Sequence, residues 1–291
     1  MFRGVYTALV TPFTKQGKLD LPALRKLVRT QLEGGVAGLV PTGTTGESPT
    51  LDPEETEEVI RCVVEEAHSR VPVIAGTGSN CTEKAIHLTE MAKAAGAAAS
   101  LQVAPYYNKP TPEGFFRHFS AIADAVDLPS IVYNIPGRTG KNIDNQTMLR
   151  LAAHPRIVAV KEASGDLAQV MDLLARRPAG FAVLSGDDNM TFPMMALGGE
   201  GVISVASNLV PARMAKLVSL ALSGSWEEAR AEHFALLPLF KALFLETNPI
   251  PVKAALAAKN LIEESYRLPM CPMASENRAR LMAVLRETGV L

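Results

Sequence analysis

One short stretch carries both a structural and a chemical signal: Ile157-Val158-Ala159-Val160-Lys161-Glu162-Ala163-Ser164-Gly165. Its aliphatic start predicts a buried parallel strand, and the small and polar residues at its end predict a turn into a helix near Asp166. Because side chains alternate along a strand, Ile157, Ala159 and Lys161 are expected on one face, and the residues between them on the other. Lys161 therefore ends the predicted strand.

The position of Lys161 is compatible with two roles. If its face of the strand borders an enclosed space, loss of hydration lowers the pKa of the ammonium group and leaves more free amine to attack a carbonyl carbon. Alternatively, the side chain only extends into water, as many lysines at strand ends do. The stretch by itself leaves both interpretations open.

Composition and charge indicate a globular protein and exclude two classes of binding partner. The chain has 291 residues, of which 47% are hydrophobic, so it can form one large core or two small domains. Its formal net charge is -1, from 29 basic and 30 acidic side chains, and it has no basic run. Neither nucleic acid nor an anionic membrane is therefore expected as a partner.

The cysteines and the start of the chain predict a reduced protein of the cytoplasm. Cys62, Cys81 and Cys271 are odd in number and lack the spacing of metal ligands, so we expect free thiols and no metal site. The apolar segment at residues 4–10 is short for a signal peptide, and Thr11-Pro12 follows it. No apolar run reaches the length needed to span a membrane.

Aliphatic runs recur at the spacing of one strand and one helix. Eight strands are expected, at residues 4–10, 37–40, 71–75, 98–104, 130–133, 157–161, 181–184 and 201–205. Amphipathic patterns between them, such as residues 21–32 and 52–68, predict helices that open with Asp or Pro signals. Eight such units predict an α/β protein with a (β/α)8 TIM barrel, because an open doubly wound sheet usually has fewer strands and a nucleotide-binding glycine motif.

The repeat ends before the end of the chain. We expect residues 1–224 to form the (β/α)8 barrel and residues 225–291 to form an appended C-terminal helical region. The second region has three helical patterns, at residues 225–244, 250–260 and 275–287. The segment Asn248-Pro249-Ile250-Pro251 predicts a turn before the second of them, because proline fixes φ and needs no hydrogen-bond donor.

Tyr133 and Lys161 end consecutive predicted strands, at the edge where the active sites of such barrels gather. Neighbouring parallel strands lie roughly 4.8 Å apart, so the two side chains are expected to meet if both point inward. A phenol beside a desolvated amine can transfer the protons that carbinolamine formation and dehydration require. The pair therefore favours a catalytic interpretation over that of a core or rim tyrosine.

Other polar residues at the same edge have two interpretations each. Residues 43–47, Gly-Thr-Thr-Gly-Glu, predict either backbone N–H groups that face a carboxylate or phosphate, or a tight turn capped by threonine. Arg138 offers a planar fork to a second carboxylate, although loop arginines are more often only solvated. Asp187 and Asp188 could bind a metal, but a helix cap is favoured.

Together these motifs resemble the pyruvate-dependent class I aldolases, the family of dihydrodipicolinate synthase and N-acetylneuraminate lyase. The resemblance spans the whole chain, and residues 43–47, 105–108, 137–139 and 248–253 look like the synthase branch. It implies a metal-independent Schiff-base lyase that condenses pyruvate with L-aspartate 4-semialdehyde to 4-hydroxy-tetrahydrodipicolinate in lysine and diaminopimelate biosynthesis. A related aldolase for a sugar-acid aldehyde and a non-catalytic pyruvate-binding regulatory barrel stay open as alternatives.

The resemblance also implies a role for each catalytic residue. Lys161 forms a Schiff base with pyruvate, and Tyr133 donates and accepts protons. Thr44 links Tyr133 to Tyr107, which comes from the neighbouring subunit. We therefore expect a homo-oligomer, either a dimer or a dimer of dimers that forms a homotetramer.

The implied substrate contacts involve two carboxylates. Thr45 binds the carboxylate of pyruvate with help from the backbone at Ile203 and Gly186, and Arg138 holds the carboxylate of the semialdehyde. Because an iminium ion is itself an electron sink, no cofactor and no metal are expected.

The chain departs from the feedback-inhibited members of the family at one site. The resemblance implies an allosteric-site remnant at Ser48, Asn80, Lys84 and Tyr106. Feedback-inhibited members bind lysine at a subunit interface and carry a glutamate where this chain has Lys84. A cation in place of an anion should repel the ammonium group of lysine, so we expect weak or absent inhibition by lysine.

Overall fold

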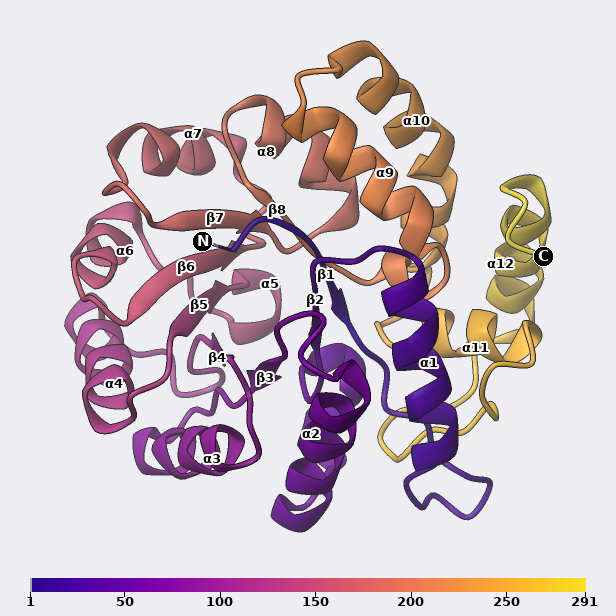
Figure 1. Cartoon of the computed structure of the whole chain (residues 1–291), viewed down its shortest axis with the longest axis horizontal. Helices are drawn as coiled ribbons and strands as arrows, with labels where there is room; N and C mark the ends of the chain where they lie inside the picture. The colour runs from indigo at the N-terminus through magenta and orange to yellow at the C-terminus, as the bar shows by residue number, and fades with distance from the viewer. Residues whose placement is uncertain (1) are drawn as a thin grey trace.

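The computed structural model describes residues 2–291, and its centre is a ring of eight parallel strands surrounded by helices (Figure 1). The strands are β1 Gly4–Ala8, β2 Gly38–Val40, β3 Ile74–Gly76, β4 Ala99–Val103, β5 Ser130–Asn134, β6 Ile157–Glu162, β7 Ala182–Ser185 and β8 Gly201–Ser204. Their order in the sheet is β2-β1-β8-β7-β6-β5-β4-β3.

The ring closes between β2 and β3. Leu39 and Val73 form a parallel bridge, and the Leu39 N–H donates to the Pro72 carbonyl at 3.1 Å. The Gly76 N–H donates to the Pro41 carbonyl at 3.0 Å. The sheet therefore closes on itself, and the predicted (β/α)8 barrel is confirmed.

Helices follow the strands and cover the outside of the barrel. They are α1 Leu21–Glu33, α2 Pro53–Ala67, α3 Thr82–Ala94, α4 Pro112–Ala125, α6 Asn145–Ala152, α7 Leu167–Arg176, α8 Thr191–Ala196 and α9 Pro211–Leu222. The predicted helices at residues 21–32 and 52–68 agree with α1 and α2 to within one residue at each end. Both begin with an aspartate cap: the Asp20 carboxylate accepts from the Ala23 N–H at 3.0 Å, and Asp52 from the Glu55 N–H at 2.8 Å.

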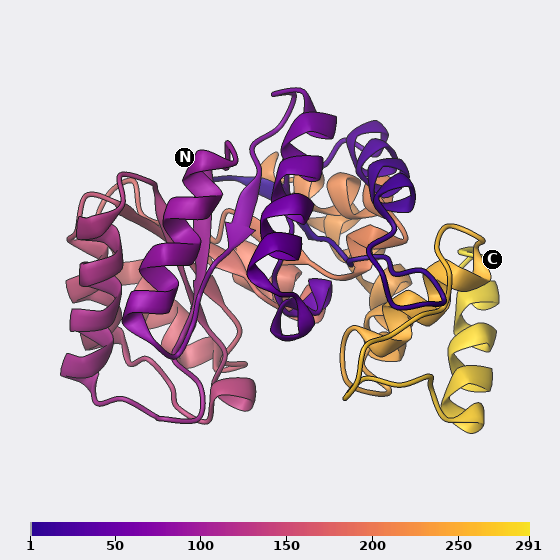
Figure 2. The same ribbon diagram turned by 90° about the horizontal axis from the view of Figure 1, so that it is seen from below.

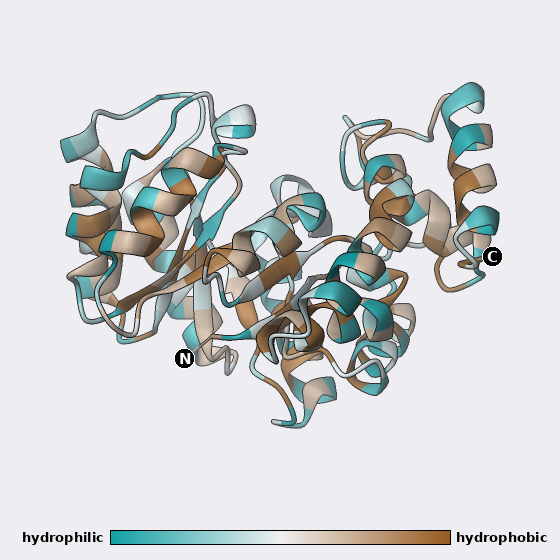
Figure 3. Cartoon of the chain, turned by 90° about the horizontal axis from the view of Figure 1, so that it is seen from above, coloured by the Kyte–Doolittle hydropathy of each residue, from teal (hydrophilic) through white to brown (hydrophobic). Residues whose placement is uncertain are grey.

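The barrel interior is a packed core. Its buried side chains include Tyr6, Ala8, Val40, Ile74, Ala99, Leu101, Ile131, Ala159, Ala182, Leu184 and Ile203. Figure 3 shows hydrophobic residues concentrated on the strands, whereas the helices combine hydrophobic and hydrophilic faces. Side chains fill the interior, and a cavity that includes Lys161 opens at the C-terminal end of the strands.

Strand β6 departs from the expected alternation at its start. Residues 130–131 of β5 pair with Ile157 and Ala159 of β6, so Val158 is an extra residue on β6. A bulge of this kind shifts the residues before it to the opposite face. Ile157 consequently packs in the cluster outside the barrel, and its predicted grouping with Ala159 and Lys161 is wrong, whereas Ala159 and Lys161 face inward as predicted.

Three further helices follow the barrel: α10 Trp226–Ala242, α11 Ile250–Ala258 and α12 Ser275–Glu287. α11 and α12 lie together on one side of the barrel, away from α4 and α6 (Figures 1 and 2). The division into two regions at residue 224 falls between α9 and α10 and stays a prediction. Within residues 2–291, no helix combines the length and apolar character needed to cross a membrane.

Candidate active site

Lys161 lies at the mouth of the barrel, at the C-terminal end of β6. Only 6% of this residue is exposed. Burial lowers the pKa of its ammonium group to about 8, although the carboxylates of Asp188 and Asp187 act in the opposite direction. At pH 7 this leaves about one amine in ten uncharged, compared with about one in 3,000 for an ordinary lysine. The amine is therefore prepared to act as a nucleophile.

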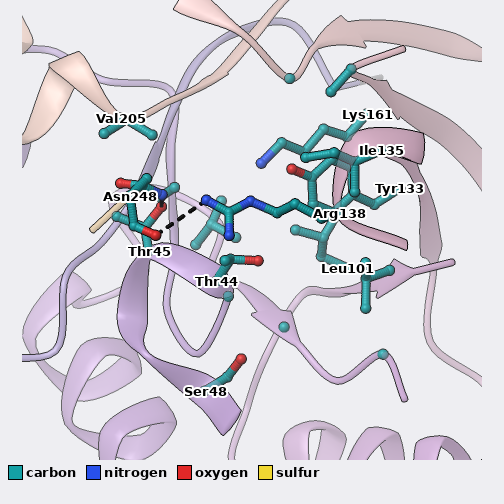
Figure 4. Close-up of a pocket in the computed structure, with 18 of the residues that line it drawn as sticks. Thr44, Thr45, Ser48, Leu101, Tyr133, Ile135, Arg138, Lys161, Val205 and Asn248 are labelled. Atoms are coloured by element: carbon teal, nitrogen blue, oxygen red, sulfur yellow. Dashed lines mark hydrogen bonds between the residues drawn. The ribbon is translucent and has the colours of Figure 1, made fainter. Parts of the chain in front are cut away.

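Tyr133 ends β5 beside Lys161, with which it is paired in the sheet register. The Lys161 Nζ lies 4.1 Å from the centroid of the Tyr133 ring, and both side chains reach into the same cavity (Figure 4). The predicted meeting of the two side chains is confirmed. Burial raises the pKa of the Tyr133 phenol far above its ordinary value, so the group carries its proton near neutral pH and can donate it.

Gly186, which follows β7, makes room for the Lys161 side chain. A Cβ atom at this position would lie 3.2 Å from the Lys161 Cε and 2.7 Å from the Ala163 Cβ. The Gly186 N–H donates to the Glu162 carbonyl at 2.7 Å, which holds the backbone in place. A larger residue at position 186 would thus displace the amine.

The loop after β2 faces Lys161 across the cavity (Figure 4). Its threonines form the short 3-10 helix η1, Thr44–Gly46, and Thr45 is buried. Within residues 2–291, the N–H groups of Thr44 and Thr45 donate no hydrogen bond. The loop is a tight turn, as one interpretation expected, but no threonine side chain caps η1. Its free N–H groups also suit an anion, as the other interpretation expected.

Arg138 supplies a positive charge at the mouth of the cavity. It lies on the single-turn helix α5, Pro136–Thr139, and its Nη2 donates to the Asn248 backbone carbonyl at 3.2 Å (Figure 4). Arg138 is an exposed residue, and it borders the cavity. It is placed to meet a carboxylate that approaches the amine.

Asn248 is a member of the site that sequence reasoning missed. Its Nδ2 donates to the Thr45 Oγ1 at 2.9 Å, and its carbonyl accepts from Arg138. The sequence offers a signal here, because residues 248–251 predict a turn and residues 248–253 are one of the motifs of the family resemblance, but neither observation assigns Asn248 to the site. Asn248 therefore brings the C-terminal region into contact with both sides of the cavity.

Asp188 contributes to the site through its hydrogen bonds and its charge. Its Oδ2 accepts from the N–H groups of Val205 and Ala206 at 3.1 and 2.8 Å, so it caps the segment after β8 instead of its own helix. Burial raises the pKa of this carboxyl group to about 6. Within residues 2–291, no three His, Cys, Asp or Glu side chains are grouped to hold a metal ion.

Two of the predicted site residues lie outside the cavity of this single chain. Tyr107 is 89% exposed on the loop after β4 and does not line the cavity. Ile203 is fully buried within β8, and Val205, two residues further along, lines the cavity. The residues that line the cavity of one chain thus do not include the Tyr107 of that chain.

A second cavity adjoins the first. The two share Thr44, Ser48 and Arg138 in their walls. Lys84 and Tyr106 line the second cavity, and Asn80 donates from its Nδ2 to the Tyr106 carbonyl at 3.2 Å. Three of the four residues predicted as an allosteric remnant thus line one cavity, and the fourth, Asn80, bonds to one of them.

A desolvated lysine paired with a tyrosine at the end of a (β/α)8 barrel defines a class I aldolase-type lyase. Comparison with known proteins agrees: the model of the dihydrodipicolinate synthetase family matches residues 1–288. The chain therefore belongs to this family, and the resemblance seen in its motifs is confirmed.

Individual relatives are similar over their full length. The 4-hydroxy-tetrahydrodipicolinate synthase of Koribacter versatilis is 53% identical over 290 residues, which cover 99% of this chain and 97% of the relative. The crystal structure of the dihydrodipicolinate synthase of Thermotoga maritima is 46% identical, with a TM-score of 0.98 over 100% of both chains. A chloride-inhibited synthase of Acinetobacter baumannii complexed with pyruvate is 43% identical, with a TM-score of 0.98 over 100% of both chains.

The lowered pKa of Lys161 predicts how its reactivity depends on pH. The rate at which Lys161 reacts with acetic anhydride, followed by peptide mass spectrometry, should rise as the pH increases through about 8 and then level off, because only the free amine reacts. In Asp188→Asn the midpoint should move to lower pH, because a carboxylate that favours the ammonium form is lost. A midpoint near that of exposed lysines would contradict the desolvation of Lys161.

Proposed function

We propose that the protein is a 4-hydroxy-tetrahydrodipicolinate synthase, which condenses pyruvate with L-aspartate 4-semialdehyde. One observation carries the proposal: the buried Lys161 amine, with its pKa lowered to about 8, lies 4.1 Å from the Tyr133 ring centroid. Membership of the family and the names of its relatives support the choice of reaction. The relative crystallised with pyruvate supports the first substrate.

The first half of the reaction activates pyruvate. The free amine of Lys161 attacks the ketone carbon, and the carbinolamine then loses water to give an iminium ion. Tyr133 supplies the proton that the departing hydroxyl needs and later accepts one. Loss of a methyl proton turns the iminium ion into an enamine, and the positive nitrogen takes up the electron pair, so the step needs no metal or cofactor.

The second half forms the new carbon–carbon bond. The enamine carbon attacks the aldehyde carbon of the semialdehyde, and the aldehyde oxygen takes up a proton. The amino group of the semialdehyde then attacks the iminium carbon, closes the ring and releases Lys161 as free amine. One water molecule leaves overall, and the enzyme returns to its starting state.

The two carboxylates of the substrates have separate positions in this scheme. The pyruvate carboxylate binds at Thr45, aided by the backbone at Ile203 and Gly186. Arg138 binds the carboxylate of the semialdehyde. The free N–H groups of the Thr45 loop and the position of Arg138 in the wall of the cavity support this division.

The proton relay extends from Tyr133 through Thr44 to Tyr107 of a neighbouring subunit. The exposure of Tyr107, and its position outside the cavity of its own chain, support a donor from another copy. The protein acts as a homo-oligomer, a dimer or a dimer of dimers, in the cytoplasm, where the pathway to lysine and diaminopimelate runs. Neither nucleic acid nor a membrane is a partner.

The remnant of the allosteric site is proposed to be insensitive to lysine. Lys84 borders the second cavity, which Ser48 and Tyr106 also line. Its ammonium group repels that of an incoming lysine, and no carboxylate stands at position 84 to attract it.

Trapping with borohydride tests the reaction. Pyruvate and borohydride should leave a reduced adduct on Lys161, located by peptide mass spectrometry, and the enzyme should turn over L-aspartate 4-semialdehyde far faster than sugar-acid aldehydes. Arg138→Ala should raise KM for the semialdehyde about tenfold or more, because a charge-assisted fork is lost, with little effect on pyruvate trapping. Absence of the adduct would refute the Schiff base, and faster turnover of a sugar-acid aldehyde would refute the substrate.

Complementation tests the origin of Tyr107. Tyr107→Phe and Lys161→Ala should each lose most activity alone, because one lacks the proton donor and the other the nucleophile. Co-expressed together, they should recover up to about one quarter of wild-type turnover, because half of the dimers are mixed and each mixed dimer has one complete site. No recovery in purified mixed dimers would show that Tyr107 acts within its own chain.

Steady-state assays test the response to lysine. Turnover should persist at about 1 mM lysine, and Lys84→Glu should increase inhibition, because it replaces a repelling charge with an attracting one. Half-maximal inhibition of the unaltered enzyme below the millimolar range would contradict the proposed insensitivity.

A further inference from the structure

A buried ion pair joins the C-terminal region to the loop that carries Thr44 and Thr45. The Lys253 Nζ of α11 lies 2.5 Å from the Glu47 Oε1. Lys253 is 0% exposed and Glu47 is 2% exposed. The two residues are 206 positions apart in the sequence, so only the tertiary fold brings them together.

Such a pair is a poor way to gain stability alone. Both charges lose their hydration, and burial lowers the pKa of the Lys253 ammonium group, while Glu47 acts in the opposite direction. Replacing a buried ion pair with apolar residues of similar size often leaves the stability of a protein unchanged or increases it. A directional role, in which the charges hold particular atoms in position, explains the pair better than stability does.

The contacts of both side chains are directional. The Lys253 Nζ also donates to the Thr11 carbonyl at 3.1 Å and lies 4.4 Å from the centroid of the Phe13 ring. The second oxygen of Glu47 accepts from the Arg267 N–H at 3.2 Å. The Glu47 carboxylate is thus held by two separate segments of the C-terminal region.

Glu47 needs such support because its backbone is strained. Its φ is 53°, in the left-handed region that residues other than glycine seldom adopt. The Glu47 N–H donates to the Thr44 carbonyl at 3.1 Å and so ends η1. The contacts that hold the Glu47 side chain therefore also hold the residue at which the threonine turn ends.

Two further bonds hold the residues just before Glu47. The Asn248 Nδ2 donates to the Thr45 Oγ1 at 2.9 Å, and the Thr11 Oγ1 donates to the Gly46 carbonyl at 2.7 Å. Thr11 thus accepts from Lys253 through its carbonyl and binds Gly46 through its hydroxyl. Residues 45, 46 and 47 are each held by a different group.

We propose that Lys253 and Glu47 are positioning residues, through which the C-terminal helical region orients the Thr44–Thr45 turn for the carboxylate of pyruvate. The inference rests on the proposed function of Thr45. According to this inference, α11 contributes to substrate binding, although none of the residues of α11 has to contact the substrate.

The test removes both charges together. The double variant Glu47→Gln, Lys253→Met avoids a stranded buried charge, so it is expected to fold. The pyruvate concentration that half-saturates borohydride trapping should rise about 10- to 100-fold, because a misplaced turn binds the carboxylate poorly. The trapping rate at saturating pyruvate should change by less than about threefold, because the Lys161–Tyr133 pair remains.

A second measurement needs no substrate. Hydrogen exchange at the amides of Gly46, Glu47 and Ser48, whose N–H groups bond within the turn, should accelerate in the double variant. Arg278→Met is the matched control, because Arg278 also forms an ion pair in the C-terminal region, with Glu264 at 2.5 Å, and within residues 2–291 neither of these side chains bonds to the turn at residues 43–48. It should change neither the exchange nor the pyruvate concentration for half-saturation.

The outcomes separate this inference from the proposed function. An unaltered protein that forms no pyruvate adduct would refute the proposed function. An unaltered protein that forms the adduct, combined with an unchanged half-saturating concentration in the double variant, would refute only the positioning role. An equal shift in Arg278→Met would also refute it, because general loosening of the C-terminal region would then explain the effect.

Discussion

The chemistry of this protein depends on keeping one amine away from water. Lys161 extends from a packed barrel interior, with Ala159 below it on the same strand and Gly186 beside it. Because these neighbours are small, the amine has enough space. The closed ring of strands excludes solvent from it. The carboxylates of Asp188 and Asp187 oppose this effect of burial, so the pKa of the Lys161 amine is lowered only to about 8.

The strands and the loops around this amine supply different groups to the site. The strands supply the reacting pair, because the register of the neighbouring parallel strands β5 and β6 places Lys161 beside Tyr133. The loops supply groups suited to anions, from Arg138 on one side and the threonine turn on the other. Asn248 bonds to both sides and ties them to the C-terminal region, so the appended helices are structurally continuous with the cavity.

Much of this arrangement was predictable from the chain alone. Aliphatic runs separated by capped amphipathic helices indicate eight strand–helix units, since burial on both faces of a parallel strand requires such runs. Consecutive strands lie side by side in such a barrel, so the meeting of Tyr133 and Lys161 follows from their positions at the strand ends. The residues alone indicate that Arg138 and the loop at residues 43–47 suit anions, whereas the resemblance supplies the substrates that they bind and the role of Tyr107; these roles are proposals.

The tertiary structure decided what depends on contacts between distant segments. The bulge at Val158 reflects the hydrogen-bond register of β6 with β5, which the alternation of one strand does not contain. The bond from Asn248 to Thr45 and the pair of Lys253 with Glu47 join residues more than 200 positions apart. Local sequence determined which elements form, because propensity, capping and hydrophobic period act over a few residues. The buried polar contacts depend on tertiary structure, because the closed barrel and the C-terminal helices remove these polar groups from water. Each buried group must then form hydrogen bonds with another group of the protein.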